Sequence, residues 1–168
     1  YLEELCERVK WPSVLSVPRL DYMEVAETNH PKSYFDEIPL GPVGFRANML
    51  RSASGRAYLS FCSRIERDTI LQRLRDKDVP GNKLAWDQKA IDRMVRVTCK
   101  NGFAVRTDDF GGDYDKSRDF VDDGRESIAV PIKVSNAIFG CLNITWRNHV
   151  LALDEAVKTL LPALQETV

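Results

Sequence analysis

The chain has 168 residues, of which 43% are hydrophobic and 29% are charged, so it is long enough to bury a core and too apolar for a disordered segment or a coiled-coil rod. Its 24 Lys and Arg residues balance 25 Asp and Glu residues, which argues against direct binding of this segment to a nucleic acid. No apolar run reaches the roughly 18 residues that a membrane-spanning helix needs.

The N-terminal quarter predicts one helix followed by short strands. Apolar residues in 2–9 follow a helical spacing, and Pro12 ends that run. Residues 13–44 alternate strand-forming residues with prolines, a pattern typical of antiparallel strands joined by turns. The strand-forming residues of this segment are Val14, Val17, Tyr22, Val25, Tyr34, Phe35 and Ile38.

The middle of the chain predicts three helices, over residues 52–61, 64–75 and 84–100, because apolar residues recur there three and four positions apart. A hydroxyl of Ser52 or Ser54 is available to cap the first helix. The Asn-Gly pair that follows the third helix is a strong stop signal, since Gly adopts the left-handed conformation readily.

The C-terminal part predicts a strand over 103–107, a loop over 108–124, a hairpin of two strands and a last helix capped by Asp154. The hairpin strands cover 127–134 and 137–146. Strands, helices, more strands and a closing helix together indicate an α+β domain built on an antiparallel sheet.

On the second hairpin strand, regular alternation places the even-numbered residues from Ile138 to Trp146 on one face and the odd-numbered residues from Phe139 to Thr145 on the other. Asn143 and Thr145 therefore share a face. If that face is covered, the two side chains need hydrogen-bond partners, which a bound ligand, neighbouring backbone or water can supply.

The start of the 52–61 helix is a second candidate for ligand binding, because free N–H groups and the helix dipole favour an anion such as a carboxylate there. Arginine side chains near these segments can bind a carboxylate through two hydrogen bonds. The candidates are Arg46, Arg51, Arg106 and Arg125.

Other chemistries are poorly supported by the sequence. The four cysteines form no CxxC pair and lie far from either histidine, so we expect buried, reduced thiols and no metal site. The Asp-rich segment 108–124 lacks the spacing of a calcium loop and is interpreted as a solvated, mobile loop. Ser52-Ala53-Ser54-Gly55 lacks the GxSxG pattern of a nucleophile elbow, and helix capping explains it better.

Several segments, in their order along the chain, resemble the effector-binding domain of IclR-type transcriptional regulators. They are SASGRAYLSFC (52–62), KNGFAVR (100–106), SIAVPI (127–132) and FGCLNITW (139–146). The similarity extends from residue 1 to residue 165 and is greatest to activators of aromatic-acid catabolism of the hydroxyphenylpropionate kind.

The resemblance implies a GAF-like α+β fold, with a curved antiparallel sheet of about six strands flanked by helices. Residues 1–168 would form the effector-binding domain, and an N-terminal winged helix-turn-helix domain, absent from this chain, would bind DNA. Family members are cytoplasmic homodimers or tetramers that sense small organic acids. The family implies no cofactor and no catalysis.

The resemblance also implies a site for the effector, here expected to be an aromatic acid. Backbone N–H groups at the start of the 52–61 helix would hold it, together with polar side chains on the last two strands and an apolar wall. The family's acidic pocket residue falls in segment 107–126, which is longer here, so either Arg106 or an Asp takes that position. The site residues so assigned are Met49, Ala53, Ser54, Arg106, Ser127, Asn143 and Thr145. An aromatic ring would also need apolar walls, for which Phe103 and Leu142 are further candidates.

Two alternatives stay open at this point. A GAF-type sensor from a kinase or cyclase signalling chain would share the fold and the pocket, and differ in the domain attached to it. A small hydrolase would use Ser54 or Cys141 as its nucleophile and would be labelled covalently at one dominant site.

Overall fold

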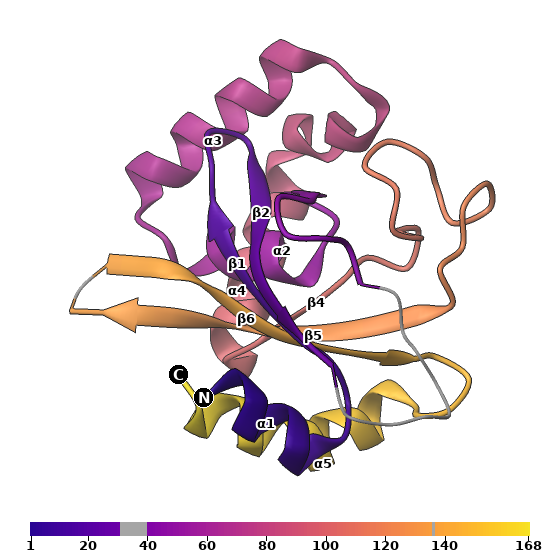
Figure 1. Cartoon of the computed structure of the whole chain (residues 1–168). Helices are drawn as coiled ribbons and strands as arrows, with labels where there is room; N and C mark the ends of the chain where they lie inside the picture. Colours follow the sequence, from indigo (N-terminus) through magenta and orange to yellow (C-terminus); the bar gives the residue numbers. More distant parts are fainter. Residues whose placement is uncertain (31–39, 136) are drawn as a thin grey trace.

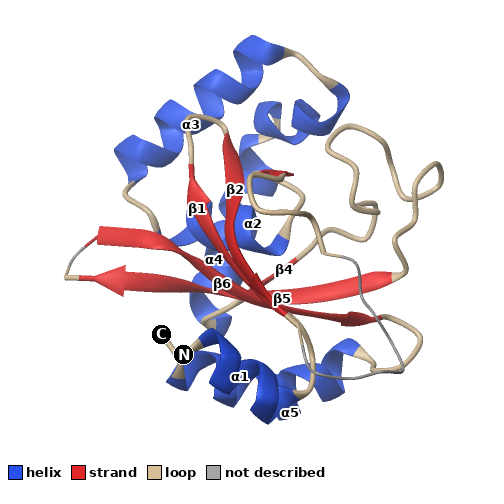
Figure 2. Ribbon diagram, in the orientation of Figure 1, coloured by secondary structure: helices blue, strands red, loops and turns tan. Residues whose placement is uncertain are grey.

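Six antiparallel strands form one curved sheet in the order β3-β2-β1-β6-β5-β4, as predicted for the fold class (Figures 1 and 2). The computed structural model describes residues 1–30, 40–135 and 137–168. The predicted strand residues Tyr34, Phe35 and Ile38 lie outside these described residues. The strands are β1 (Ser13–Pro18), β2 (Tyr22–Asn29), β3 (Arg46–Asn48), β4 (Ala104–Val105), β5 (Arg125–Val134) and β6 (Ala137–Arg147).

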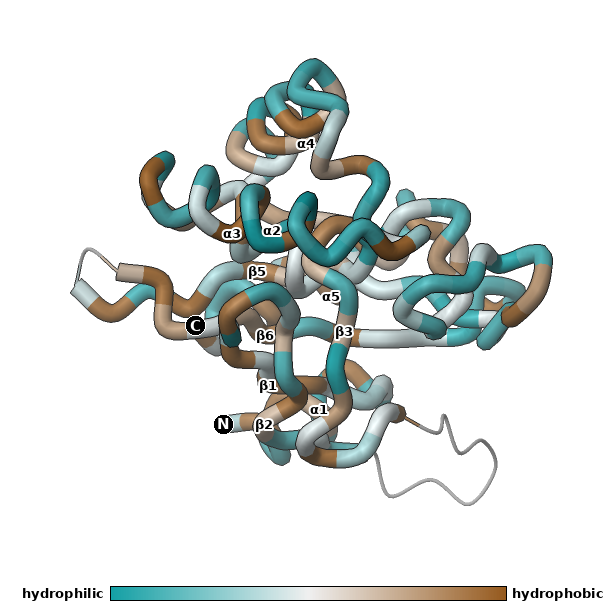
Figure 3. Tube along the Cα trace, turned by 90° about the horizontal axis from the view of Figure 1, so that it is seen from above, coloured by the Kyte–Doolittle hydropathy of each residue, from teal (hydrophilic) through white to brown (hydrophobic). Residues whose placement is uncertain are grey.

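Helices cover both faces of the sheet (Figure 2). α2 lies against β5 and β6, and α4 packs on the outside of α2 (Figure 3). α1 and α5 pack together on the opposite face of the sheet (Figure 1). The helices are α1 (Leu2–Val9), α2 (Ala53–Phe61), α3 (Arg64–Lys77), the 3-10 helix η1 (Pro80–Trp86), α4 (Gln88–Asn101) and α5 (Leu153–Glu166).

Alternation along β5 divides the core into two clusters. Ala129 faces the cluster that α2, α3 and α4 build with the sheet. Its neighbours Ile128 and Val130 face the second cluster, under α1 and α5. β5 therefore contributes apolar side chains to the core on both of its faces, in keeping with a sheet covered by helices on each side.

The predicted alternation on β6 is wrong at its first residues. Ile138 packs with Cys141 against the α2 cluster, whereas Leu142 and Trp146 belong to the α5 cluster. The register between β5 and β6 shifts at this end, because Ile132 pairs with Gly140 and the next residue of β5 pairs with Ile138. The extra residue on β6 is a β-bulge. It places the earlier residues of β6 on the face opposite to the one that regular alternation predicts.

Three predicted boundaries also need correction. α4 begins at Gln88 and not at residue 84, because the Asp87 carboxylate accepts a hydrogen bond from the Ala90 amide (3.0 Å) and caps the helix, and residues 84–86 belong to η1. α5 follows Ala152, so Asp154 lies in its first turn and does not cap it. β4 has only two residues, because its ladder with β5 is limited to two pairs.

We expect Leu59→Ala to lower the free energy of unfolding by about 2–5 kcal/mol, because Leu59 is fully buried in the α2 cluster and its truncation leaves a cavity. Urea denaturation measures the change. Ile65→Ala on α3 is the matched control, since Ile65 is 82% exposed, and it should change stability by less than about 0.5 kcal/mol. Equal losses in the two variants would contradict the core assignment.

Candidate functional site

A cavity of about 340 Å³ lies between the start of α2, strands β1, β5 and β6, and the loop that follows β4. Six of the seven residues expected at the site line it together. They are Ala53, Ser54, Arg106, Ser127, Asn143 and Thr145.

The seventh residue, Met49, does not line the cavity. Its side chain is wholly buried in the core cluster under α2. The backbone of Met49 instead supports the start of the helix, where a Cβ on Gly55 would lie 2.4 Å from the Met49 carbonyl oxygen. Gly55 is therefore required for this close approach, and Met49 contributes through its main chain.

Polar side chains from the last two strands form the floor of the cavity. Ser127 on β5 pairs directly with Thr145 on β6, and Asn143 lies two residues further along β6 on the same face. The Asn143 Nδ2 donates a hydrogen bond to Thr145 Oγ1 (3.2 Å), and all three side chains are buried. The floor thus offers hydroxyl and amide groups in a sheltered place, where a ligand's polar atoms would find partners.

The first turn of α2 closes one end of the cavity. Ser52 caps the helix, because its Oγ accepts a hydrogen bond from the Gly55 amide (3.1 Å) and donates one to the Asn48 carbonyl (2.7 Å). The amides of Ala53 and Ser54 are first-turn donors that helix geometry leaves without an intrahelical partner. Together with the positive end of the helix dipole they favour an anion.

Two arginines and one aspartate also line the cavity. The Arg106 guanidinium contacts the Asp123 carboxylate at 3.0 Å, and Arg125 Nε lies 4.0 Å from the same oxygen. Burial lowers the pKa of Arg106, while Asp123 acts to raise it. Among the described lining residues, the charged groups therefore carry one positive charge in excess.

Both arginines have unused hydrogen-bonding capacity. Within the described part of the chain, the buried Nε atoms of Arg106 and Arg125 have no hydrogen-bond partner. These two atoms are buried within the protein, so an anion in the cavity would be bound by the other guanidinium N–H groups of the two arginines. The charge excess of the lining favours a carboxylate.

The loop after β4 forms the remaining wall and is not the solvated segment that its composition predicts. Phe110 is 7% exposed, and its ring lies 4.6 Å from the Arg106 guanidinium. Gly111 packs so closely on the Val121 backbone that a Cβ would lie 1.6 Å from its carbonyl oxygen. Asp123, from the end of the loop, is the acidic residue among the described residues that line the cavity.

Buried Arg51 holds this loop in place. Its Nη1 donates to the carbonyl of Tyr114 (3.0 Å), and its Nη2 donates to the carbonyls of Asp109 and Lys116 (both 2.9 Å). The preceding element contributes as well, because Asn48 Nδ2 donates to the same Tyr114 carbonyl (3.3 Å). Arg51 was a candidate for carboxylate binding, but the structure places it among loop carbonyls outside the cavity.

Three other expected residues lie elsewhere. The guanidinium carbon of Arg46, on β3, lies 4.8 Å from the centroid of the Tyr22 ring, on β2. Leu142 faces α5 on the opposite side of the sheet, and Phe103 also packs there. The apolar walls come instead from residues that the sequence did not indicate, because no periodic pattern marks them. They are Val14, Val25, Phe45, Phe110 and Val121.

Comparison with solved structures identifies the architecture. An IclR family transcriptional regulator from Brucella abortus matches 98% of this chain with a TM-score of 0.73 at 18% sequence identity. An IclR transcriptional regulator from Alicyclobacillus acidocaldarius matches 99% with a TM-score of 0.71 at 18% identity. The chain has the IclR effector-domain fold. No family model matches the sequence.

A third match with the IclR fold was solved with a ligand. The inducer-binding domain of the PobR transcription factor from Acinetobacter, as a double mutant in complex with 3-hydroxybenzoic acid, matches 99% of this chain and 89% of its own, with a TM-score of 0.74 at 15% identity. The chain spans only 56% of the Brucella regulator and 61% of the Alicyclobacillus regulator.

Within the described part of the chain, neither candidate nucleophile of the hydrolase alternative has an activating partner. Cys141 is fully buried, and burial raises the pKa of its thiol. Ser54 Oγ lies 3.4 Å from Ser52 Oγ, a hydroxyl that cannot act as a general base. Among the described residues, no cluster of His, Cys, Asp and Glu is arranged to hold a metal ion, and no helix combines the length and apolar character needed to cross a bilayer.

We expect Arg51→Lys to loosen the loop over residues 108–124, because an ammonium cannot reproduce the fork of hydrogen bonds to backbone carbonyls. Hydrogen exchange of the loop amides should accelerate at least about tenfold while exchange in β5 stays unchanged. Arg64→Lys on the exposed surface of α3 is the control. Unaltered protection of the loop in Arg51→Lys would show that the clamp is dispensable.

Thiol alkylation by iodoacetamide at pH 8 should modify exposed Cys99 first. Burial raises the pKa of Cys62 to about 12 and also raises that of Cys141, so both thiols stay protonated and inaccessible in the native protein. Mass spectrometry of native and urea-unfolded samples measures the order of labelling. Rapid, dominant labelling of native Cys141 would instead support a nucleophilic role.

Proposed function

We propose that residues 1–168 form the ligand-sensing domain of a transcriptional regulator, and that the effector is a small aromatic carboxylate bound in the cavity on β5 and β6. The observation that carries this proposal is that one cavity is lined together by the start of α2, by Arg106 and Arg125, and by the polar side chains of β5 and β6. The IclR fold supports the assignment to a regulator, since the matched proteins described above are transcription factors.

The size and lining of the cavity favour a single-ring acid. A volume of about 340 Å³ lies at the lower end of the range for small-molecule sites. Phe45 and Phe110 supply aromatic walls for a ring, and Asn143 and Thr145 supply partners for a hydroxyl substituent. The carboxylate would accept hydrogen bonds from the amides of Ala53 and Ser54 or from Arg106 and Arg125. The double mutant of the PobR inducer-binding domain, which has the same fold, forms a complex with 3-hydroxybenzoic acid.

In this proposal the domain carries out no reaction and needs no cofactor. DNA binding belongs to a separate N-terminal domain, in keeping with the 56–61% of the IclR regulators that the chain spans. The domain also contributes to a cytoplasmic homodimer or tetramer. An effector shifts DNA binding only if it binds one quaternary arrangement more tightly than another, and such coupling is typically about 1–3 kcal/mol.

Calorimetric titration with 3-hydroxybenzoate tests the site. The double variant Asn143→Leu with Thr145→Val should bind it about tenfold to hundredfold more weakly than the parent chain, because two hydrogen-bonding side chains are replaced by apolar ones of similar size. An exposed pair, Asn148→Leu with Thr159→Val, is the matched control and should retain the parent affinity.

Circular dichroism and the melting temperature establish that both variants fold. Equal affinity in the parent chain and in the cavity variant would show that this cavity is not the effector site. If no member of a panel of aliphatic and aromatic carboxylates binds, the proposed sensing function is wrong. A ligand at 100 times its Kd stabilises a domain by about 2.7 kcal/mol, so a thermal-shift screen has ample sensitivity for this panel.

A further inference from the structure

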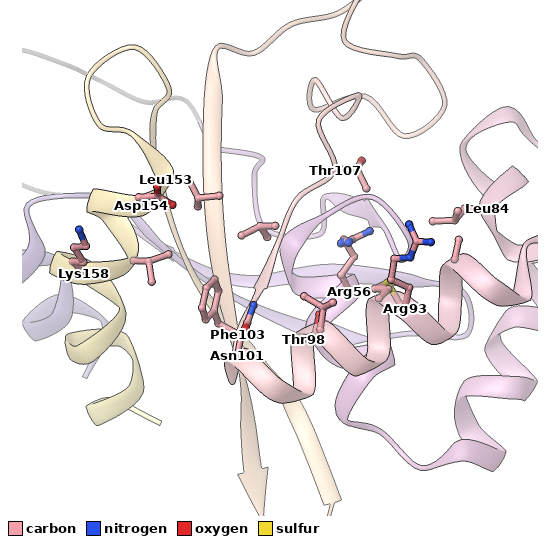
Figure 4. Close-up of a pocket in the computed structure, with 15 residues that line it drawn as sticks. Arg56, Leu84, Arg93, Thr98, Asn101, Phe103, Thr107, Leu153, Asp154 and Lys158 are labelled. Carbon is pink, nitrogen blue, oxygen red and sulfur yellow. The ribbon is translucent and has the colours of Figure 1, made fainter.

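A second and larger hollow, of about 820 Å³, runs along the outer edge of the sheet (Figure 4). It is a groove over the edge strand β4, with α4 on one side and α5 on the other. Its volume is within the range of sites for small organic ligands. Nothing in the proposed sensing mechanism uses it.

The groove is mainly apolar. Phe103 and Val105 line it from the β4 segment, and Met94 and Val97 line it from α4. From α5 it is lined by Leu153 and Val157, with the charged residues Asp154 and Lys158 beside them. Val97 is 48% exposed, although it lies beside other apolar side chains. An extended apolar group lying in the groove would remove this surface from water.

One end of the groove is cationic. The side chains of Arg56 on α2 and Arg93 on α4 lie together near Leu84, and Phe103 lies between them and α5 (Figure 4). Within residues 1–30, 40–135 and 137–168, no ion pair joins either guanidinium to an acidic residue. Two positive charges at the end of an apolar groove favour the binding of an anion there.

Arg56 is the more buried of the two arginines. Its Nη1 donates to the Leu50 carbonyl (3.3 Å), and its Nε is buried away from the groove. Burial lowers the pKa of Arg56, and the carboxylates of Asp108 and Asp109 act to raise it. An anion in the groove would therefore be held by the other guanidinium N–H groups of Arg56 together with those of Arg93.

We infer that this groove is a second ligand site, for an amphipathic monocarboxylate whose head group binds Arg56 and Arg93 and whose apolar tail lies along Phe103 toward α5. The charge of the head and the length of the apolar floor distinguish this ligand from the compact ring acid proposed for the smaller cavity.

The two sites share their walls. Arg106 lines the smaller cavity, whereas its neighbours Val105 and Thr107 line the groove. In the same way, Ser54 of α2 lines the cavity and Arg56, two residues later, lines the groove. A ligand in the groove therefore contacts elements that also form the smaller cavity.

Calorimetric titration with octanoate tests the inference, with octylamine as the probe of opposite charge and octan-1-ol as the neutral probe. Octanoate should bind saturably and more tightly than either. Arg93→Gln should weaken octanoate binding at least about tenfold by removing a charged donor, while the fold is preserved because Arg93 is exposed. Arg96→Gln, on the same helix outside the groove, should have no effect.

Binding of 3-hydroxybenzoate separates this inference from the proposed function. Arg93→Gln should retain affinity for 3-hydroxybenzoate, and the Asn143→Leu, Thr145→Val double variant should retain affinity for octanoate. Loss of octanoate binding in that double variant, or unchanged binding in Arg93→Gln, would overturn the second site, as would equal binding of octan-1-ol. Sedimentation that shows a dimer abolished by Val97→Asp would assign the groove to a second copy of the chain and also overturn it.

Discussion

The candidate site depends on one buried guanidinium. Arg51 leaves the turn before α2 and donates hydrogen bonds to the carbonyls of a loop more than fifty positions later in the sequence. Burying a cation is costly unless its donors are occupied, and these carbonyls occupy most of them. The same bonds replace water as the partner of an irregular backbone, which allows the loop to cover the sheet. Without this wall, the polar floor on β5 and β6 would be open to solvent.

The position of α2 is a second constraint of the same kind. Its first turn rests on the backbone of Met49, and only glycine at position 55 permits that distance. The polar strip formed by Ser127, Asn143 and Thr145 therefore lines the same cavity as Ala53 and Ser54 of the helix start. A helix start and a strand face come together in one cavity only because α2 packs on the sheet.

The sequence predicts those elements whose pattern is local. Helical spacing gives α1, α2 and α3, and the alternation in the last hairpin gives β5 and most of β6. Regular alternation misplaces Ile138, since a bulge adds one residue that no composition or spacing reveals. For the site, Asn143 and Thr145 follow from alternation and Ser54 from its place in the first helical turn. Asp123, Phe45 and Phe110 lie in segments without periodicity, and long-range hydrogen bonds determine where they lie.

The packing of α1 against α5 has a topological consequence. The helices at the two chain ends lie side by side, and an ion pair between Arg8 and Glu166 (2.7 Å) joins them (Figure 1). Neither helix lines the effector cavity. A short linker between the ends would therefore close the chain into a circle, and new termini opened in the surface turn between β1 and β2 would give a circular permutant with the same neighbours for every strand. The order in which the elements are synthesised is thus separable from the sheet that they build.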